Sequence, residues 1–192
     1  MYSNRNNGLQ IISLFRRSYK ARFYLREISK LSKLSLKTCQ NTLANLEKAK
    51  ILKTKTEGKN KYFSLNLENI RTKLYLQQTE IYQTDLFIEK YPQIKMFLKS
   101  LETTAPIIVF GSFAKYTADK NSDLDMLTIS DKELKLPFHL LPFKPHRINM
   151  PKKTFLKAIE QQENLIKEIE ENHIILNNHS FYVNIVWGYY GK

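Results

Sequence analysis

The segment "APIIVFGSFAKYTADKNSDLDMLTIS", residues 105–130, decides the fold of the second half of the chain. It begins with a continuous apolar run over residues 105–110, which predicts a buried strand. A short helix is expected over residues 113–117, and residues 123–130 predict a second strand. The segment therefore predicts a strand, helix, strand unit in which polar residues occupy the ends of the strands.

A Gly-Ser pair and two carboxylates lie at those strand ends. Asp123 and Asp125 are two residues apart on a strand, so both side chains point to one face. Adjacent carboxylates repel unless a cation lies between them, and Mg²⁺ binds carboxylate oxygens and substrate phosphates together. Gly111 lets the backbone approach a phosphate, to which the Ser112 hydroxyl and nearby amides can bond. These residues predict a phosphate and metal site.

The spacing of these motifs, Gly-Ser followed after ten residues by Asp-x-Asp, resembles the signature of the polymerase-beta-like nucleotidyltransferase superfamily in its minimal form. The resemblance implies transfer of a nucleotidyl group from a nucleoside triphosphate to a hydroxyl acceptor, with two metal ions. It implies that Gly111 and Ser112 bind the nucleotide. It also implies that Asp123 and Asp125 are the catalytic residues and bind Mg²⁺.

The chain departs from that family pattern in two places. The family often has Gly four residues after the Ser, where this chain has Tyr116. The family's third carboxylate lies on a following strand, and the next strand here is expected within residues 137–151, which contain no Asp or Glu. That segment offers His139, His146 and Arg147 instead. Two interpretations therefore stay open: an active nucleotidyltransferase, and a degenerate domain that a non-enzymatic transcriptional regulator uses for sensing or dimerisation.

The positive charge of the chain is concentrated in its first third. The formal net charge is +13, and residues 1–65 hold 15 Lys and Arg against 3 acidic residues, whereas residues 66–192 hold 16 against 15. A basic segment of this kind favours a polyanionic partner such as nucleic acid.

The basic third also has a recognisable order of elements. Apolar residues at helical spacing predict one helix at 8–18 and two helices joined by a turn at 25–52, with Ser35 as the N-cap of the second. The period changes over residues 51–66, where the turn "EGKN" at 57–60 predicts a β-hairpin.

This order resembles the winged helix-turn-helix domain of small bacterial and archaeal regulators. Their recognition helix ends in a pattern similar to Leu-x-x-Leu-Glu-x-Ala-Gly-Leu-Ile, which here runs from Leu43 to Leu52 with Lys50 in place of the Gly. The resemblance implies binding to double-stranded DNA, and a winged helix that contacts only protein is the alternative. The side chains expected at DNA are polar or basic and lie on the second helix of the turn and on the hairpin: Lys37, Thr38, Gln40, Asn41, Lys55, Lys59 and Lys61.

A connector follows, because residues 67–91 lack Gly and Pro and predict a long helix that Pro92 ends. A second helix is expected at 93–104. Apolar residues recur on a heptad seam of the long helix with two polar interruptions: Leu67, Ile70, Leu74, Ile81 and Ile88, with Gln77 and Thr84. The seam either pairs with a second copy of the chain in a homodimer or packs on the chain's own domains.

The remaining residues complete an α/β (α+β) fold with a small mixed sheet and flanking helices. The tail predicts a helix from residue 152 with Phe155, Ile159, Ile166 and Ile169 on one side, and then a turn at Asn177-Asn178 into an aromatic-rich strand. The expected domains are a winged helix at 1–66, a helical connector at 67–104 and a nucleotidyltransferase-like domain at 105–192.

Composition excludes several other classes of protein. The chain has one cysteine, Cys39, which excludes an intramolecular disulfide and a cysteine-rich zinc site and fits a reducing cytoplasm. The first residues show no signal-peptide pattern. No stretch approaches the roughly 18 apolar residues of a membrane span, so a cytoplasmic protein without membrane contact is expected.

Overall fold

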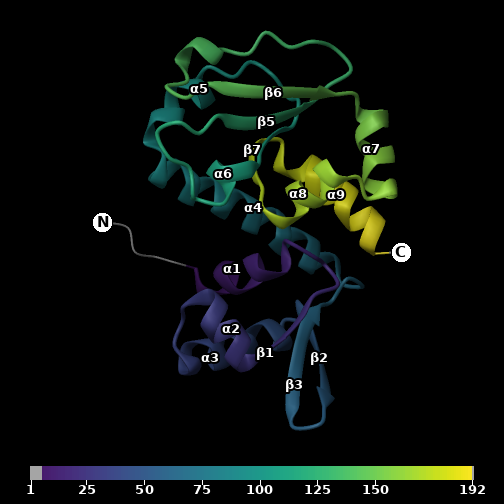
Figure 1. Ribbon diagram of the computed structural model, residues 1–192. Coiled ribbons are helices and arrows are strands. Elements are labelled where there is room, and N and C mark those ends of the chain that lie inside the picture. The colour runs from purple at the N-terminus through teal and green to yellow at the C-terminus, as the bar shows by residue number, and fades with distance from the viewer. Residues whose placement is uncertain (1–5, 192) are drawn as a thin grey trace. The chain divides into compact units, whose positions relative to one another are not determined.

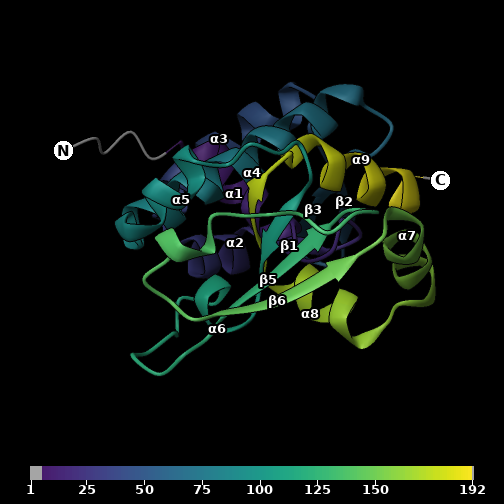
Figure 2. The ribbon, with the colours of Figure 1, turned by 90° about the horizontal axis from the view of Figure 1, so that it is seen from above.

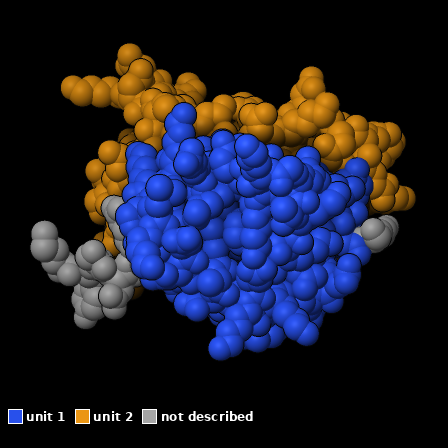
Figure 3. Space-filling view, turned by 90° about the horizontal axis from the view of Figure 1, so that it is seen from below, with its two compact units in different colours: residues 1–79, 186–192 blue, residues 80–185 orange. Residues whose placement is uncertain are grey.

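The structure, a computed structural model, describes residues 6–191 of the chain. The chain forms two compact units, one of residues 1–79 with 186–192 and one of residues 80–185 (Figure 3). The helices α4 (Ile70–Lys90) and α9 (His179–Tyr190) each contribute residues to both units. The division into three domains at residues 66 and 104 stays a prediction.

The first unit consists of helices and a small antiparallel sheet (Figure 1). Its strands lie in the order β1-β3-β2. The elements follow the chain as α1 (Asn7–Ile12), the 3-10 helix η1 (Ser13–Phe15), β1 (Arg22–Tyr24), α2 (Leu25–Ser32), α3 (Leu36–Lys48), β2 (Leu52–Glu57) and β3 (Asn60–Leu65). The predicted helices and hairpin are therefore present, and strand β1 is an addition that the sequence pattern did not indicate.

Local signals explain where the elements of the first unit begin and end. The Ser35 side chain accepts a hydrogen bond from the backbone N–H of Thr38 at 3.1 Å, which confirms the N-cap of α3. Lys50, which stands where the regulator pattern has Gly, has a φ of 57°. That left-handed conformation is the one that Gly adopts without strain, so the position keeps the backbone geometry of the pattern.

The second unit is built on a four-stranded mixed sheet in the order β6-β5-β4-β7. Strand β4 is antiparallel to β5 and to β7, whereas β5 and β6 are parallel and lie side by side (Figure 2). The strands are β4 (Ile107–Val109), β5 (Leu124–Ile129), β6 (Pro145–Met150) and β7 (Ile174–Asn177). The other helical elements are η2 (Pro92–Ile94), α5 (Lys95–Lys99), α6 (Gly111–Ala114), η3 (Phe138–Leu140), α7 (Lys152–Gln161) and α8 (Asn164–Glu171). This is the α/β fold with a small mixed sheet and flanking helices that the sequence predicts.

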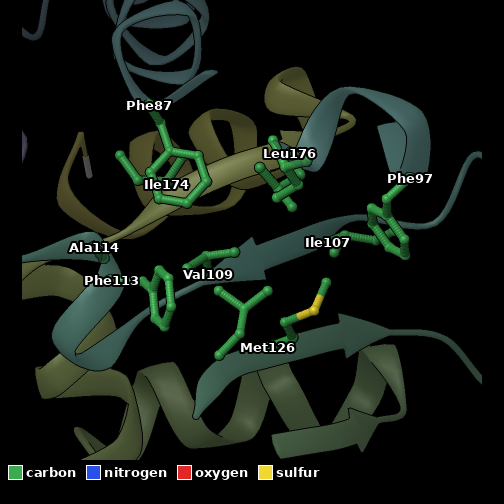
Figure 4. Packing of buried hydrophobic residues seen from close by; sticks show 11 residues of the cluster. Phe87, Phe97, Ile107, Val109, Phe113, Ala114, Met126, Ile174 and Leu176 are labelled. Carbon is green, nitrogen blue, oxygen red and sulfur yellow. The ribbon is translucent and has the colours of Figure 1, made fainter. Parts of the chain in front are cut away.

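Apolar side chains cover both faces of this sheet. Leu124 and Met126 are buried in a cluster with Phe97 and Phe113 from the helices α5 and α6 (Figure 4). Leu127, which points to the other face because side chains alternate along a strand, is also fully buried. The tail predicted as one helix forms two, α7 and α8, which are separated at Gln162 with a φ of 52°. The four apolar residues of the prediction are nevertheless all buried: Phe155, Ile159, Ile166 and Ile169. Strand β5 is thus held by pairing with β4 and β6 and by burial of its apolar side chains on both faces.

The prediction of an aromatic-rich strand after residue 178 is wrong. Residues 179–190 form helix α9, and the strand β7 lies before the turn. The side chain of Asn178 caps the helix by accepting from the Phe181 N–H at 3.3 Å. Tyr182, Val183 and Val186 are buried at helical spacing, so burial of this face outweighs the strand preference of aromatic and β-branched residues.

Several predicted helices have different limits. The helix expected at 8–18 ends with η1 at Phe15, and the helix expected at 67–91 runs from Ile70 to Lys90, so Leu67 lies before it. The helix expected at 93–104 is shorter, because only the turn η2 and the helix α5 form within it. The helix expected at 113–117 begins earlier, at Gly111, and ends at Ala114. Among the described residues, no helix combines the length and the apolarity needed to cross a membrane.

Candidate functional site

Strand pairing brings the Gly-Ser pair against the Asp-x-Asp motif. The backbone N–H of Phe110 donates to the carbonyl of Asp125 at 3.1 Å, which extends the pairing of β4 with β5 by one bond. The next residue, Gly111, has a φ of 67°. A Cβ atom at Gly111 would collide with Oδ2 of Asp125. Gly111 is therefore favoured both by its left-handed backbone and by the close approach of the carboxylate.

The two aspartates lie on one face at the beginning of β5, as predicted. Asp123 immediately precedes the strand and its side chain is 41% exposed, while the side chain of Asp125 is 27% exposed. Ser112 is half-buried and directly follows Gly111. The structure thus brings Gly111 and Asp125 into contact. Ser112 directly follows Gly111, and Asp123 lies two residues before Asp125.

The neighbouring strand β6 and the residue before it supply a basic partner for each aspartate. The Nζ of Lys144 donates to Oδ2 of Asp123 at 3.0 Å. The Nδ1 of His146 lies 2.9 Å from Oδ1 of Asp125. A carboxylate only accepts hydrogen bonds, so Nδ1 is the donor in this contact. His146, which could have been an uninvolved surface residue, is 60% exposed and contacts the site.

The parallel register of β5 and β6 explains these contacts. Asp125 is paired with His146, and Leu124 with Pro145. The backbone N–H of Leu124 also donates to the carbonyl of Lys144 at 2.8 Å, which holds Lys144 beside Asp123. Sequence reasoning missed Lys144 and named His146 without its contact to Asp125, because these contacts depend on which strand pairs with β5 and in what register.

The loop between α6 and β5 is ordered by its own polar groups. The Asp119 carboxylate accepts from the backbone N–H of Asn121 at 2.9 Å and from the Ser122 hydroxyl at 3.0 Å. These hydrogen bonds, chiefly that from Asn121, lower the pKa of Asp119. The loop therefore has a hydrogen-bonded conformation immediately before Asp123.

Tyr116 occupies the position where the nucleotidyltransferase pattern often has Gly. Its φ is 59°, which is the left-handed conformation that favours Gly and costs other residues about 1–2 kcal/mol. Its ring stacks with Tyr91 at 6.3 Å between centroids and an interplanar angle of 11°. Burial raises the pKa of Tyr91. Tyr116 therefore combines a left-handed backbone with packing of its ring against Tyr91.

The donor set at the Asp pair fits magnesium with a bound phosphate. Among the described residues there is no group of three or more His, Cys, Asp or Glu side chains that could hold a metal ion. Magnesium, however, is commonly bound through one or two carboxylates together with substrate phosphates. Asp123 and Asp125 supply two carboxylates on one face, and Asp125 directs Oδ2 towards Gly111. They therefore suit a metal that arrives with a triphosphate.

The candidate DNA-contacting residues of α3 lie on its exposed side. Lys37, Gln40 and Asn41 are exposed. Thr38 is half-buried, and its hydroxyl is 2.9 Å from the hydroxyl of Ser35 at the helix N-cap. Thr38 thus has a role in the structure of the helix, while the other three present amide and ammonium groups to solvent.

The three lysines of the hairpin differ from one another. Lys61 contacts the carboxylate of Glu47 on α3 at 2.8 Å. This hydrogen bond, together with one from Thr54, lowers the pKa of Glu47. Lys55 lies 3.0 Å from Glu57. Lys55 and Lys61 thus form ion pairs, and the pair of Lys61 with Glu47 links the hairpin to α3. Lys59 is exposed at the turn.

Comparison with known proteins supports a nucleotidyltransferase-like domain in the second unit. The family model described as "Nucleotidyltransferase domain" matches residues 92–180, a range that includes the Gly-Ser pair, the Asp pair and all four strands of the larger sheet. Comparisons with curated proteins and with solved structures find no match. The match supports nucleotide binding and nucleotidyl-transfer chemistry for this part of the chain.

The contact at Gly111 leads to a stability prediction with an internal control. Gly58 has a φ of 59° with no atom within 4 Å of an added Cβ, whereas Gly111 combines a φ of 67° with the collision at Asp125. Gly58→Ala is expected to lower the free energy of unfolding by about 1–2 kcal/mol through backbone strain alone. Gly111→Ala is expected to cost clearly more, as measured by urea unfolding followed by circular dichroism. Equal losses in the two variants would show that the carboxylate does not restrict the site.

Proposed function

We propose that this chain binds double-stranded DNA through its first unit, and a nucleoside triphosphate with Mg²⁺ through its second unit. The second unit then transfers a nucleotidyl group to a hydroxyl acceptor. The observation that carries the proposal is the contact of Gly111 with Asp125, which joins the expected phosphate-binding and metal-binding motifs in one site. The nucleotidyltransferase match over residues 92–180 supports the reaction class.

Different residues of the site would bind the phosphates and the metal ion. Gly111 and Ser112 would hold the phosphates, since Gly permits close approach of the backbone and Ser supplies a hydroxyl. Asp123 and Asp125 would hold Mg²⁺, which, when bound, neutralises phosphate charge that develops during transfer. The oxygen of the acceptor forms a bond to the α-phosphorus as the bond to the bridging oxygen breaks, and pyrophosphate leaves. In this proposal the hydroxyl proton passes to water.

A non-enzymatic regulator with a degenerate nucleotidyltransferase domain is the second candidate. The observation that favours it is the pairing of each aspartate with a basic side chain, Lys144 or His146, in place of a third acid. In that case the second unit would serve for sensing or dimerisation and would perform no transfer.

The DNA-binding part of the proposal depends on charge and on the order of elements. Residues 1–65 carry most of the excess positive charge of the chain. The helices α2 and α3 followed by the hairpin β2–β3 have the order of a winged helix-turn-helix domain. In this proposal α3 reads base edges through Gln40 and Asn41, while Lys37 and Lys59 contact phosphates. The regulators with this arrangement control transcription.

A second copy of this chain is the proposed partner of helix α4. Its predicted seam presents apolar side chains to solvent, with Ile70, Leu74 and Ile81 exposed by 61%, 51% and 55%. Thr84, by contrast, is buried, and its hydroxyl donates to the carbonyl of Ile175 at 2.7 Å, so the seam ends before that residue. A heptad spacing of exposed apolar residues suits pairing of two helices.

Nucleotidyl transfer can be tested with a labelled nucleoside triphosphate, Mg²⁺ and a mixture of hydroxyl acceptors. Asp125→Asn is expected to lower the transfer rate by roughly 100-fold or more, because it weakens the site that holds the metal. Asp85→Asn, which removes an exposed carboxylate from α4, serves as the matched control and should retain the rate. Equal, background-level transfer by the parent and Asp125→Asn would reject the enzyme and favour the regulator.

DNA binding should weaken steeply as salt increases, because contacts of lysine with phosphate release counterions. Lys37→Ala and Lys59→Ala are each expected to lower the affinity and to reduce the slope of log K against log salt by about 1. Lys157→Ala, which removes an exposed lysine from the second unit, should leave both unchanged. Absent or salt-insensitive binding, measured by fluorescence anisotropy, would count against this part of the proposal.

The homodimer can be tested by sedimentation velocity. Leu74→Glu is expected to convert the parent dimer into a monomer, because it places a charge in the apolar seam. Gln161→Glu introduces the same charge at an exposed position of α7, outside the helix that carries the seam, and should leave the dimer intact. A parent chain that is monomeric at tens of micromolar would contradict the proposal.

A further inference from the structure

Strand β6 and the residue before it give the Asp pair its own counter-groups. Lys144 contacts Asp123, and His146 contacts Asp125, at 3.0 Å and 2.9 Å respectively. Repulsion between two carboxylates on one face is thereby offset within the protein. Any cation that binds these aspartates meets a site in which both carboxylates already have partners.

The two pairs differ in how tightly they are held. The Lys144 side chain is 81% exposed and Asp123 is 41% exposed, so solvent screens this ion pair strongly. The contact of His146 is with an aspartate that is only 27% exposed and lies against Gly111. A divalent cation would therefore displace Lys144 from Asp123 more readily than it would displace His146 from Asp125.

We propose that Lys144 is a triphosphate-binding residue that exchanges partners when the site is filled. Its ammonium group pairs with Asp123 while the site is empty. When a divalent cation and a triphosphate bind, Asp123 turns to the cation and Lys144 turns to the phosphates. This inference rests on the proposed function, since it requires the triphosphate to occupy the site at Gly111.

The chemistry of lysine and the anchoring of its backbone both suit this exchange. A lysine ammonium is a compact charge on a flexible four-carbon chain with three donors, and lysine commonly binds phosphate in this form. A triphosphate keeps negative charge after one divalent cation has bound, and that charge needs a further cation. Among the described residues, Lys144 is the lysine that contacts the Asp pair. Its carbonyl is fixed by the N–H of Leu124, so the side chain can swing while its base stays in place.

The exchange predicts opposite effects of one substitution on two ligands. With Mn²⁺ alone, Lys144→Ala removes a competing cation from Asp123, so the metal should bind about 2- to 5-fold more tightly. With Mn²⁺ and inorganic tripolyphosphate together, the same variant loses a charge-assisted contact, so the complex should bind about 10-fold more weakly. A lysine that only supports the fold of the site would weaken both.

The experiment uses the full chain and titrates it with Mn²⁺ alone, with Mn²⁺ and tripolyphosphate, and with Mn²⁺ and ATP. Free Mn²⁺ is counted by its electron paramagnetic resonance signal, and the complexes are measured by isothermal titration calorimetry. Lys144→Arg should restore most of the triphosphate affinity. Lys153→Ala, on α7 beyond the far end of β6, is the matched control and should bind as the parent does.

Each outcome has a distinct meaning. Opposite changes in the two titrations of Lys144→Ala support the exchange. If the parent binds triphosphate and Lys144→Ala binds both ligands with unchanged affinity, the role of Lys144 is overturned and the proposed function stands. Weaker binding of both ligands by Lys144→Ala would overturn the exchange as well. A parent that binds neither Mn²⁺ nor its triphosphate complex would overturn the proposed function and this inference together.

Discussion

The contact between the carboxylate of Asp125 and the backbone of Gly111 is the constraint on which the second unit depends. Antiparallel pairing of β4 with β5, extended by the bond from Phe110, brings the end of one strand to the beginning of the other. A side chain larger than hydrogen at Gly111 would take the space of the carboxylate. The opposite edge of β5 pairs in parallel with β6, which places Lys144 and His146. One strand therefore positions the Gly-Ser pair, the acids and their basic partners at once.

This arrangement explains how the fold tolerates the absence of a third acid. Two adjacent carboxylates destabilise a folded protein unless an opposite charge or a hydrogen-bond donor stands near them. Lys144 and His146 meet that requirement without a bound ion. The unit is thus compatible with a regulator that never binds a cation, and with a transferase whose cation replaces a side chain. Both proposed functions are compatible with this folded state, in which Lys144 and His146 contact the two aspartates.

Local patterns in the sequence predicted much of the fold and indicated the residues of the candidate site. The apolar pattern of residues 105–130 indicated the strand, helix, strand unit, and Ser35 marked the beginning of α3. The contacts of Lys144 could not be predicted in this way, because they depend on a pairing between segments far apart in sequence. The helix over residues 179–190 was missed for a related reason: its aromatic residues favour a strand locally, and burial of one helix face decides otherwise.

The acidic residues of the segment 1–65 explain why the positive charge of that segment is not uniform. Residues 1–65 contain three acidic residues, and each one has a structural partner. Glu27 accepts from the backbone N–H of Tyr24 at the beginning of α2. Glu47 and Glu57 pair with basic side chains of the small sheet and so reduce the charge available on the hairpin. Glu47 of α3 is paired with Lys61, so a polyanion that approaches the first unit meets the least compensated charge at Lys37 on α3 and at the hairpin turn.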